Sequence, residues 1–195
     1  MENFIDIAVK NQEKAHEIIE KTGIIGIWES VGAEVNLVGS LKTGLLMSNK
    51  DIDFHVYSSP LLVSDSFLAM SKLAAKPGIT RLEYINGIET EEQCIEWHVQ
   101  YQAEDGSAWK IDIIHILKGS KYDGYFERMA KRINEVMTPA QRQTILKLKY
   151  ETRGMERIIG VEYYQAVIRD GINNVEDFIK WRKVNPVGYI VEWIP

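Results

Sequence analysis

The residues whose types and spacing could do chemistry lie mostly in one short stretch of the chain. Gly39 and Ser40 form a predicted turn, and Asp51 and Asp53 follow it closely. A further carboxylate, Asp112, lies in a later strand-like run. Convergent carboxylates can hold divalent metal ions, and a Gly-Ser turn brings backbone N–H groups and a hydroxyl close to a phosphate. The set predicts metal-assisted transfer of a nucleotidyl group.

The strand period explains how these acids could converge. Residues i and i+2 of a strand point to the same face, so Asp51 and Asp53 aim together, and a neighbouring strand can add Asp112. Two divalent ions about 3.5–4 Å apart neutralise the phosphates and align the attacking and leaving oxygens. Magnesium prefers oxygen ligands. We therefore expect Asp51, Asp53 and Asp112 to be both the catalytic residues and the metal ligands.

The order of these residues resembles the DNA polymerase β-like nucleotidyltransferase superfamily. The resemblance covers residues 37–117 and rests on the turn, a second glycine at Gly44, the Asp-x-Asp pair and the later acidic strand. It implies a small mixed sheet with flanking helices, two Mg²⁺ ions held by the three acids, and a serine, Ser40, on the triphosphate. The C-terminal part is similar to that of small single-chain members that modify antibiotics, proteins or other small acceptors.

Several residues are candidates for holding the nucleotide. Gly39 and Ser40 are joined by the cations Lys42 and Lys50. Lys50 precedes the Asp-x-Asp pair, where the superfamily often has a small polar residue; it either helps to hold phosphate or crowds the metal site. Further candidates for triphosphate or acceptor contacts are spaced along a later helix and its end: Lys147, Lys149, Arg153 and Arg157.

Two positions have alternative interpretations. Asp112 lies in an otherwise apolar or aromatic strand, where a charge needs either a metal or a salt bridge, for example to Lys110. Glu96 and His98 share one face of the preceding strand. One of them could act as general base for an acceptor hydroxyl, or both could simply face solvent on a hairpin.

The hydrophobic pattern predicts an α/β (α+β) fold with a helical C-terminal segment. We expect a catalytic domain over residues 1–119 and a helical region over 120–195 that packs on the sheet. Asp105-Gly106 predicts a hairpin turn and Thr138-Pro139 a helix start. The expected strands are 34–38, 52–57, 81–85, 95–101 and 109–117, with another strand pattern at 187–194. The expected helices are 4–21, 24–30, 61–75 entered at Ser64 or Asp65, 125–136, one after 138, 161–169 and 175–183.

Composition narrows the class of protein. The 195 residues include 45% hydrophobic and 26% charged residues, ordinary for a soluble domain. One cysteine, Cys94, excludes an internal disulfide and favours a reducing compartment, and no signal peptide or membrane-spanning run is recognisable. We therefore expect a cytoplasmic protein without a membrane partner.

The net charge of −5 makes a nucleic-acid partner less expected. However, residues 118–157 hold ten Lys and Arg against five Asp and Glu, which leaves −10 on the rest. This segment is either a set of solvated helix faces or a basic wall facing a triphosphate or an acidic acceptor.

The leading hypothesis is an enzyme that transfers a nucleoside monophosphate, with AMP from ATP as the first candidate, to a hydroxyl of a small molecule or protein. A second is a non-catalytic nucleotide-sensing or partner-binding module on the same fold. A third and weaker one is a hydrolytic metal site for phosphodiesters.

Overall fold

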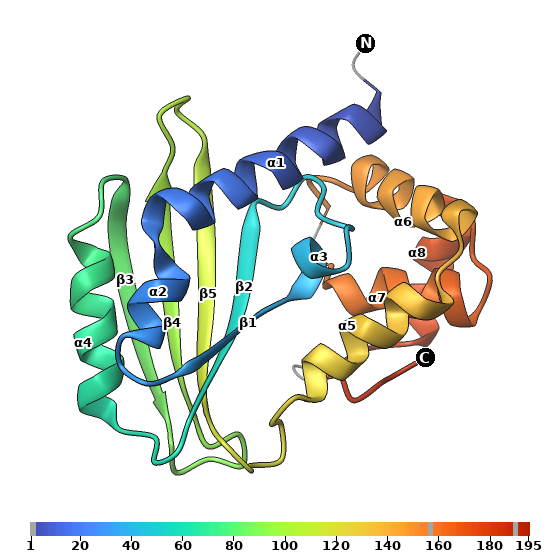
Figure 1. The fold of residues 1–195 in the computed structure, drawn as a ribbon. Helices are drawn as coiled ribbons and strands as arrows, with labels where there is room; N and C mark the ends of the chain where they lie inside the picture. Colours follow the sequence, from blue (N-terminus) through green and yellow to red (C-terminus); the bar gives the residue numbers. More distant parts are fainter. Residues whose placement is uncertain (1–2, 156–157, 189–190) are drawn as a thin grey trace.

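A five-stranded mixed sheet forms the centre of the protein in the computed structural model, which describes residues 3–155, 158–188 and 191–195 (Figure 1). The strand order is β1-β2-β5-β4-β3; β2 and β5 run parallel and the other neighbours run antiparallel. The predicted small mixed sheet is therefore confirmed. The strands are β1 (Glu34–Val38), β2 (Asp51–Ser58), β3 (Ile79–Gly87), β4 (Cys94–Gln102) and β5 (Ala108–Leu117).

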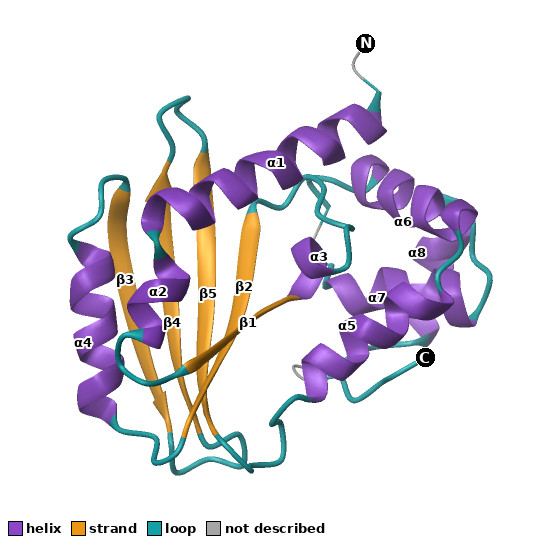
Figure 2. Ribbon diagram, in the orientation of Figure 1, coloured by secondary structure: helices purple, strands orange, loops and turns teal. Residues whose placement is uncertain are grey.

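Helices flank the sheet and fill the C-terminal part (Figure 2). A π-helical segment, Gln165–Arg169, continues α7, so the helix expected over 161–169 has two backbone forms. The helices are α1 (Phe4–Thr22), α2 (Ile24–Glu29), α3 (Gly39–Lys42), α4 (Val63–Ala74), α5 (Tyr125–Val136), α6 (Pro139–Glu151), α7 (Gly160–Tyr164) and α8 (Val175–Val184).

One face of the sheet is covered by α1, α2 and α4. Alternation along β2 places Ile52, Phe54 and Val56 on this face, where they join one large core. Trp28 of α2 and Met70 of α4 are fully buried in the same core. Because the strands alternate, the residues between these apolar ones point to the opposite face, which the three helices leave open.

A second core lies beside the sheet, among the C-terminal helices. Ala8 of α1 joins Leu45, Ile145, Tyr164 and Phe178 there, so α1 contributes to both cores. Figure 1 shows α1 running from the sheet to the helical part. Of the C-terminal helices, α6 contacts α1, while α5 contacts α3 and the edge strand β1 of the sheet. The division at residue 119 stays a prediction.

Local signals in the sequence were accurate where side chains make the cap or turn. Thr138 and Gln141 form a reciprocal capping box at the start of α6, and Gly106 takes the left-handed backbone conformation between β4 and β5. The prediction that α4 begins at Ser64 or Asp65 was wrong. The helix begins at Val63, and its N-cap residue, Leu62, makes no side-chain hydrogen bond to the helix.

The strand pattern expected over 187–194 is not seen in the described part of this segment, residues 187–188 and 191–194; Tyr189 and Ile190 lie outside it. The tail is nevertheless attached, since Trp193 packs on the second core and Arg132 donates a hydrogen bond to the carbonyl of Pro195. None of the described helices is long and apolar enough to cross a membrane.

Candidate active site

The glycine-serine turn lies directly against the acidic strand. Gly39 follows β1, has φ +67°, and begins the short helix α3. A Cβ atom at Gly39 would overlap the Asp53 carboxylate. Both the backbone conformation and the close approach therefore require glycine here. Gly44, at the end of the same turn, also has a positive φ, of +70°.

The three aspartates converge on the open face of the sheet. Asp51 and Asp53 lie two residues apart on β2, and Asp53 is the direct partner of Asp112 in the parallel pairing of β2 with β5. Burial, together with the charges of Asp112 and Asp51, raises the pKa of Asp53 to about 7. Three acids this close repel one another, and a cation between them would relieve that repulsion.

Asp112 is held on both oxygens by neighbouring side chains. Lys110 Nζ lies 2.8 Å from Oδ2, and His98 Nδ1 lies 2.6 Å from Oδ1. The salt bridge to Lys110 had been one of the two interpretations of Asp112. Within the described residues, no group of three or more His, Cys, Asp or Glu is arranged so that it could hold a metal ion. Metal binding through Asp112 therefore requires its Lys110 or His98 contact to rearrange.

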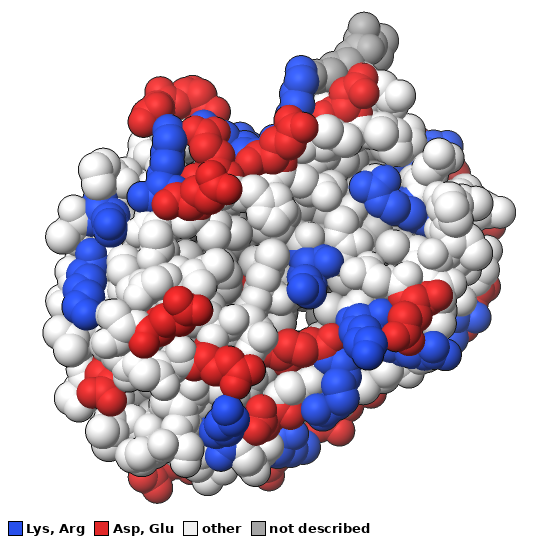
Figure 3. Space-filling view, viewed as in Figure 1, with Lys and Arg blue, Asp and Glu red and all other residues white. Residues whose placement is uncertain are grey.

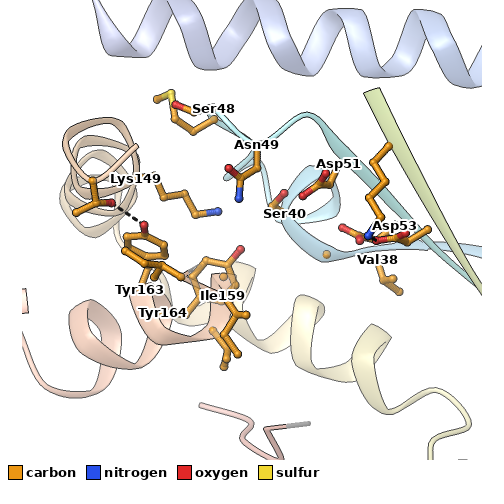
Figure 4. A pocket seen from close by; sticks show the side chains of 18 of the residues that line it. Val38, Ser40, Ser48, Asn49, Asp51, Asp53, Lys149, Ile159, Tyr163 and Tyr164 are labelled. Atoms are coloured by element: carbon orange, nitrogen blue, oxygen red, sulfur yellow. Dashed lines mark hydrogen bonds and ion pairs between the residues drawn. The ribbon is translucent and has the colours of Figure 1, made fainter. Parts of the chain in front are cut away.

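A basic and aromatic wall faces the acids across a cavity (Figure 4). Lys149 of α6 donates to the carbonyl of Leu45 at 2.9 Å, and its Nζ lies 5.3 Å from the centroid of the Tyr164 ring. Burial lowers the pKa of Lys149 to about 8, while the charges of Asp53 and Asp51 act in the opposite direction. Figure 4 shows Lys149, Tyr163 and Tyr164 on one side and the acids on the other.

The cavity has a volume of about 640 Å³, within the range of small-molecule sites. Of the residues expected to act, six line it: Gly39, Ser40, Asp51, Asp53, Asp112 and Lys149. Arg153 also lines the cavity. Lys42 is exposed on α3 outside this lining, and Lys50 lines a neighbouring groove instead. The structure therefore brings together the acids, the turn and Lys149, but not Lys42 or Lys50.

The basic segment 118–157 divides into two parts. Lys149 and Arg153 reach the cavity. By contrast, Arg132 forms a salt bridge with Glu135, and Lys147 Nζ lies 3.8 Å from Oε1 of Glu151. On the face in Figure 3, blue and red side chains are interleaved over α5 rather than gathered into one basic patch. Arg157, another candidate, lies outside the described residues.

The sequence indicated His98 as a possible general base and Lys110 as a possible partner of Asp112, but it did not predict that His98 contacts Asp112. His98 is the direct partner of Asp112 in the antiparallel pairing of β4 with β5. Lys110 precedes Asp112 by two residues and so shares its face. The sequence allows Tyr163 and Tyr164 either to stack on a nucleobase or sugar or to lie in the core; they are buried and also line the cavity. The strand pattern was enough to place Lys110 beside Asp112, whereas the contact of His98 with Asp112 could be seen only from the register of β4 on β5.

The comparisons with known proteins were made on sequence and on structure. No model of a known protein family and no curated protein matches the sequence. The structure is similar to the Cid1 poly(U) polymerase with MgGTP bound, with a TM-score of 0.59 and 13% identity over 81% of this chain. The chain spans 49% of that protein's length.

Two further solved structures are similar to this chain. A cytoplasmic RNA terminal U-transferase has a TM-score of 0.55 and 13% identity, with 84% of this chain and 52% of that chain covered. The GLD-2/RNP-8 complex has a TM-score of 0.56 and 12% identity, with 94% and 68% covered. These likenesses show that the chain shares the nucleotidyltransferase fold of these solved structures, and the three acids lie on β2 and β5 of that fold.

Proposed function

We propose that this protein is a metal-dependent nucleotidyltransferase. It moves a nucleoside monophosphate from a triphosphate, with ATP as the first candidate donor, to a hydroxyl of a small-molecule or protein acceptor. The acceptor oxygen bonds to the α-phosphorus, and the bond from that phosphorus to the bridging oxygen breaks. Pyrophosphate leaves, and the hydroxyl proton passes to solvent.

The observation that carries the proposal is the convergence of Asp51, Asp53 and Asp112 beside Gly39. The register pairs Asp53 with Asp112, and the turn lies so close to Asp53 that no side chain fits between them. A structural role alone does not explain a row of acids in which burial, followed by the charges of Asp112 and Asp51, raises the pKa of Asp53. Such an arrangement costs stability and is typical of functional sites.

The residues present fit magnesium in chemistry. Carboxylate oxygens are the ligands that Mg²⁺ prefers, and its charge offsets the repulsion among the acids. In the proposal, Asp51 and Asp53 hold the metal, and Asp112 completes the site on the side of the acceptor. Bound magnesium would neutralise the phosphates; the superfamily resemblance implies two ions.

The turn and the opposite wall would hold the nucleotide. Gly39 and Ser40 lie beside the acids and are proposed to contact the β- and γ-phosphates, with the Lys149 ammonium across the cavity as a counter-charge. Lys42 and Lys50 stay predictions as nucleotide contacts, because neither lines the cavity. A cytoplasmic location also stays a prediction; Cys94, on which it rests, is buried.

Transfer of radioactive label tests the proposal. The protein is incubated with magnesium, α-³²P-labelled ATP and candidate acceptors, and released pyrophosphate is measured together with labelled product. We expect both signals to require magnesium and to disappear in Asp51→Asn. Equal signals without magnesium, or an unchanged rate in Asp51→Asn, would contradict the assigned roles.

A second candidate is the non-catalytic, nucleotide-sensing module. It is favoured by one observation: both oxygens of Asp112 are already engaged by Lys110 and His98. A sensor would bind the triphosphate without releasing pyrophosphate, and Asp112→Asn would leave that binding unchanged. Pyrophosphate release that depends on Asp112 excludes this alternative.

A further inference from the structure

A second groove lies on the open face of the sheet, next to the cavity. It has a volume of about 500 Å³ and runs over β3, β4 and β5. Asp51 and Lys110 line both hollows, so the groove meets the cavity beside the acids. His98, which holds Asp112, lies at this junction. A molecule in the groove would therefore extend to the place where an acceptor hydroxyl is needed.

Most of the positive charge in this groove is paired with acidic side chains. Its lining holds three cations among the described residues, Lys50, Arg81 and Lys110. A guanidinium nitrogen of Arg81 lies 3.1 Å from a carboxylate oxygen of Glu83, and Lys110 Nζ lies 2.8 Å from Oδ2 of Asp112. Lys50 Nζ lies 5.7 Å from the centroid of the Trp109 ring. Two of the three cations of the groove are therefore paired with acids, and the third lies against an aromatic ring.

The pairing of these cations with acids indicates which type of ligand the groove can bind. A nucleic-acid strand is bound mainly through cations that neutralise its phosphates, and such cations must not already be matched by acids. The groove instead offers neutral polar groups, the side-chain amides of Gln100 and Gln102 and the hydroxyl of Thr80. Amides donate and accept hydrogen bonds, as the hydroxyls of a ligand do.

We propose that this groove binds the acceptor and that the acceptor is a small, neutral molecule with several hydroxyl groups. The inference rests on the nucleotidyl transfer proposed above. One acceptor hydroxyl lies at the junction beside Asp112, and the other hydroxyls bond to the amides over β4. The similar solved structures include an RNA terminal U-transferase; the paired cations of this groove are the reason why we propose a neutral acceptor for the present chain instead.

The test offers two kinds of acceptor to the intact protein with magnesium and each of the four α-³²P-labelled triphosphates. One is a set of neutral sugars and polyols; the other is a single-stranded RNA with a free 3′-hydroxyl. We expect label on a member of the first set and none on the RNA.

Gln100→Leu removes an exposed amide of the groove and should lower transfer about tenfold, the effect of about 1.4 kcal/mol of hydrogen bonding. Triphosphate affinity should not change.

Gln143→Leu is the matched control, since Gln143 is exposed on α6 outside both hollows. It should transfer label at the normal rate. Glu83→Lys should raise RNA affinity severalfold in fluorescence anisotropy, because it releases Arg81 and adds a cation.

Two results overturn the inference: label on the RNA, or no label on any sugar or polyol from a protein that still binds triphosphate. Equal transfer by Gln100→Leu and the normal protein would also overturn it. Failure to bind any triphosphate is a different outcome, because it overturns the proposed function itself.

Discussion

The two faces of the sheet are built by the same strands and have opposite properties. On β2, Ile52, Phe54 and Val56 point into the core under α1, α2 and α4. Asp51 and Asp53 alternate with them and point to the open face. The covered face gains stability from burial of apolar surface, whereas the open face brings like charges together at a cost. Adjacent residues on one strand should therefore respond to substitution in opposite ways.

The largest expected effect is on the open face. Asp53→Asn should lower transfer about a thousandfold, because it removes a charge placed to stabilise the reacting phosphate through the metal. Stability should not fall, since the substitution removes a buried charge that Asp112 and Asp51 also repel. Paired rate measurements and thermal unfolding would check this. A variant that unfolds more easily and keeps its rate would reverse the comparison.

On the covered face, the neighbouring substitution Phe54→Ala should cost about 3–5 kcal/mol of unfolding free energy, because Phe54 is fully buried and would leave a cavity. Urea titration measures the loss, and Phe54→Leu should lose less. The comparison between the faces fails for this strand if Phe54→Ala costs no more than an exposed substitution such as Gln143→Leu.

The pH dependence of stability sharpens the same comparison through His115, which is buried on the covered face against Trp28. Burial lowers its pKa to about 4. Since the unfolded imidazole titrates near pH 6.5, the stability from keeping it neutral is present above pH 6.5 and is lost as pH falls towards 4. The loss is up to about 3 kcal/mol.

Replacing His115 by Asn should remove this part of the pH slope, whatever it does to overall stability. Chemical denaturation of both proteins between pH 4 and pH 7 gives the two slopes. Identical slopes would mean that His115 is not held neutral by its covered position.

The smallest expected effect concerns the wall opposite the acids. Lys149→Met should weaken triphosphate binding about tenfold, because the buried ammonium is the counter-charge proposed for the phosphates. Lys147→Met is the matched control, since Lys147 faces Glu151 outside the cavity lining. Calorimetric titration measures the triphosphate affinity of both variants. Equal losses of affinity in the two would show that Lys149 does not contact the nucleotide.

Much of this arrangement could be predicted because its signals are local. Strand alternation placed Asp51 and Asp53 on one face, and the glycine-serine spacing placed the turn beside them. The cap of α6 was recognisable because Thr138 and Gln141 satisfy each other within one helical turn. The start of α4 was not, since no side-chain cap marks it.

The features of the site and fold that could not be predicted depend on contacts between segments far apart in the sequence. His98 reaches Asp112 only through the register of β4 on β5. The turn packs Gly39 against Asp53 and leaves Lys42 outside the cavity lining. The C-terminal helices were expected to pack on the sheet; the structure also shows contacts with α1 and α3, and a second core shared with α1, that the sequence pattern did not specify. No periodicity within a single segment specifies these pairings.

The most direct test of the central claim is calorimetric titration of ATP, GTP, CTP and UTP into the protein with and without magnesium. The convergent acids predict binding of at least one triphosphate that strengthens greatly with magnesium, is lost in Asp53→Asn and survives in Gln143→Leu. Binding that is equally strong without magnesium, or that Asp53→Asn leaves intact, would contradict the claim that the open face of this sheet is a metal-dependent nucleotide site.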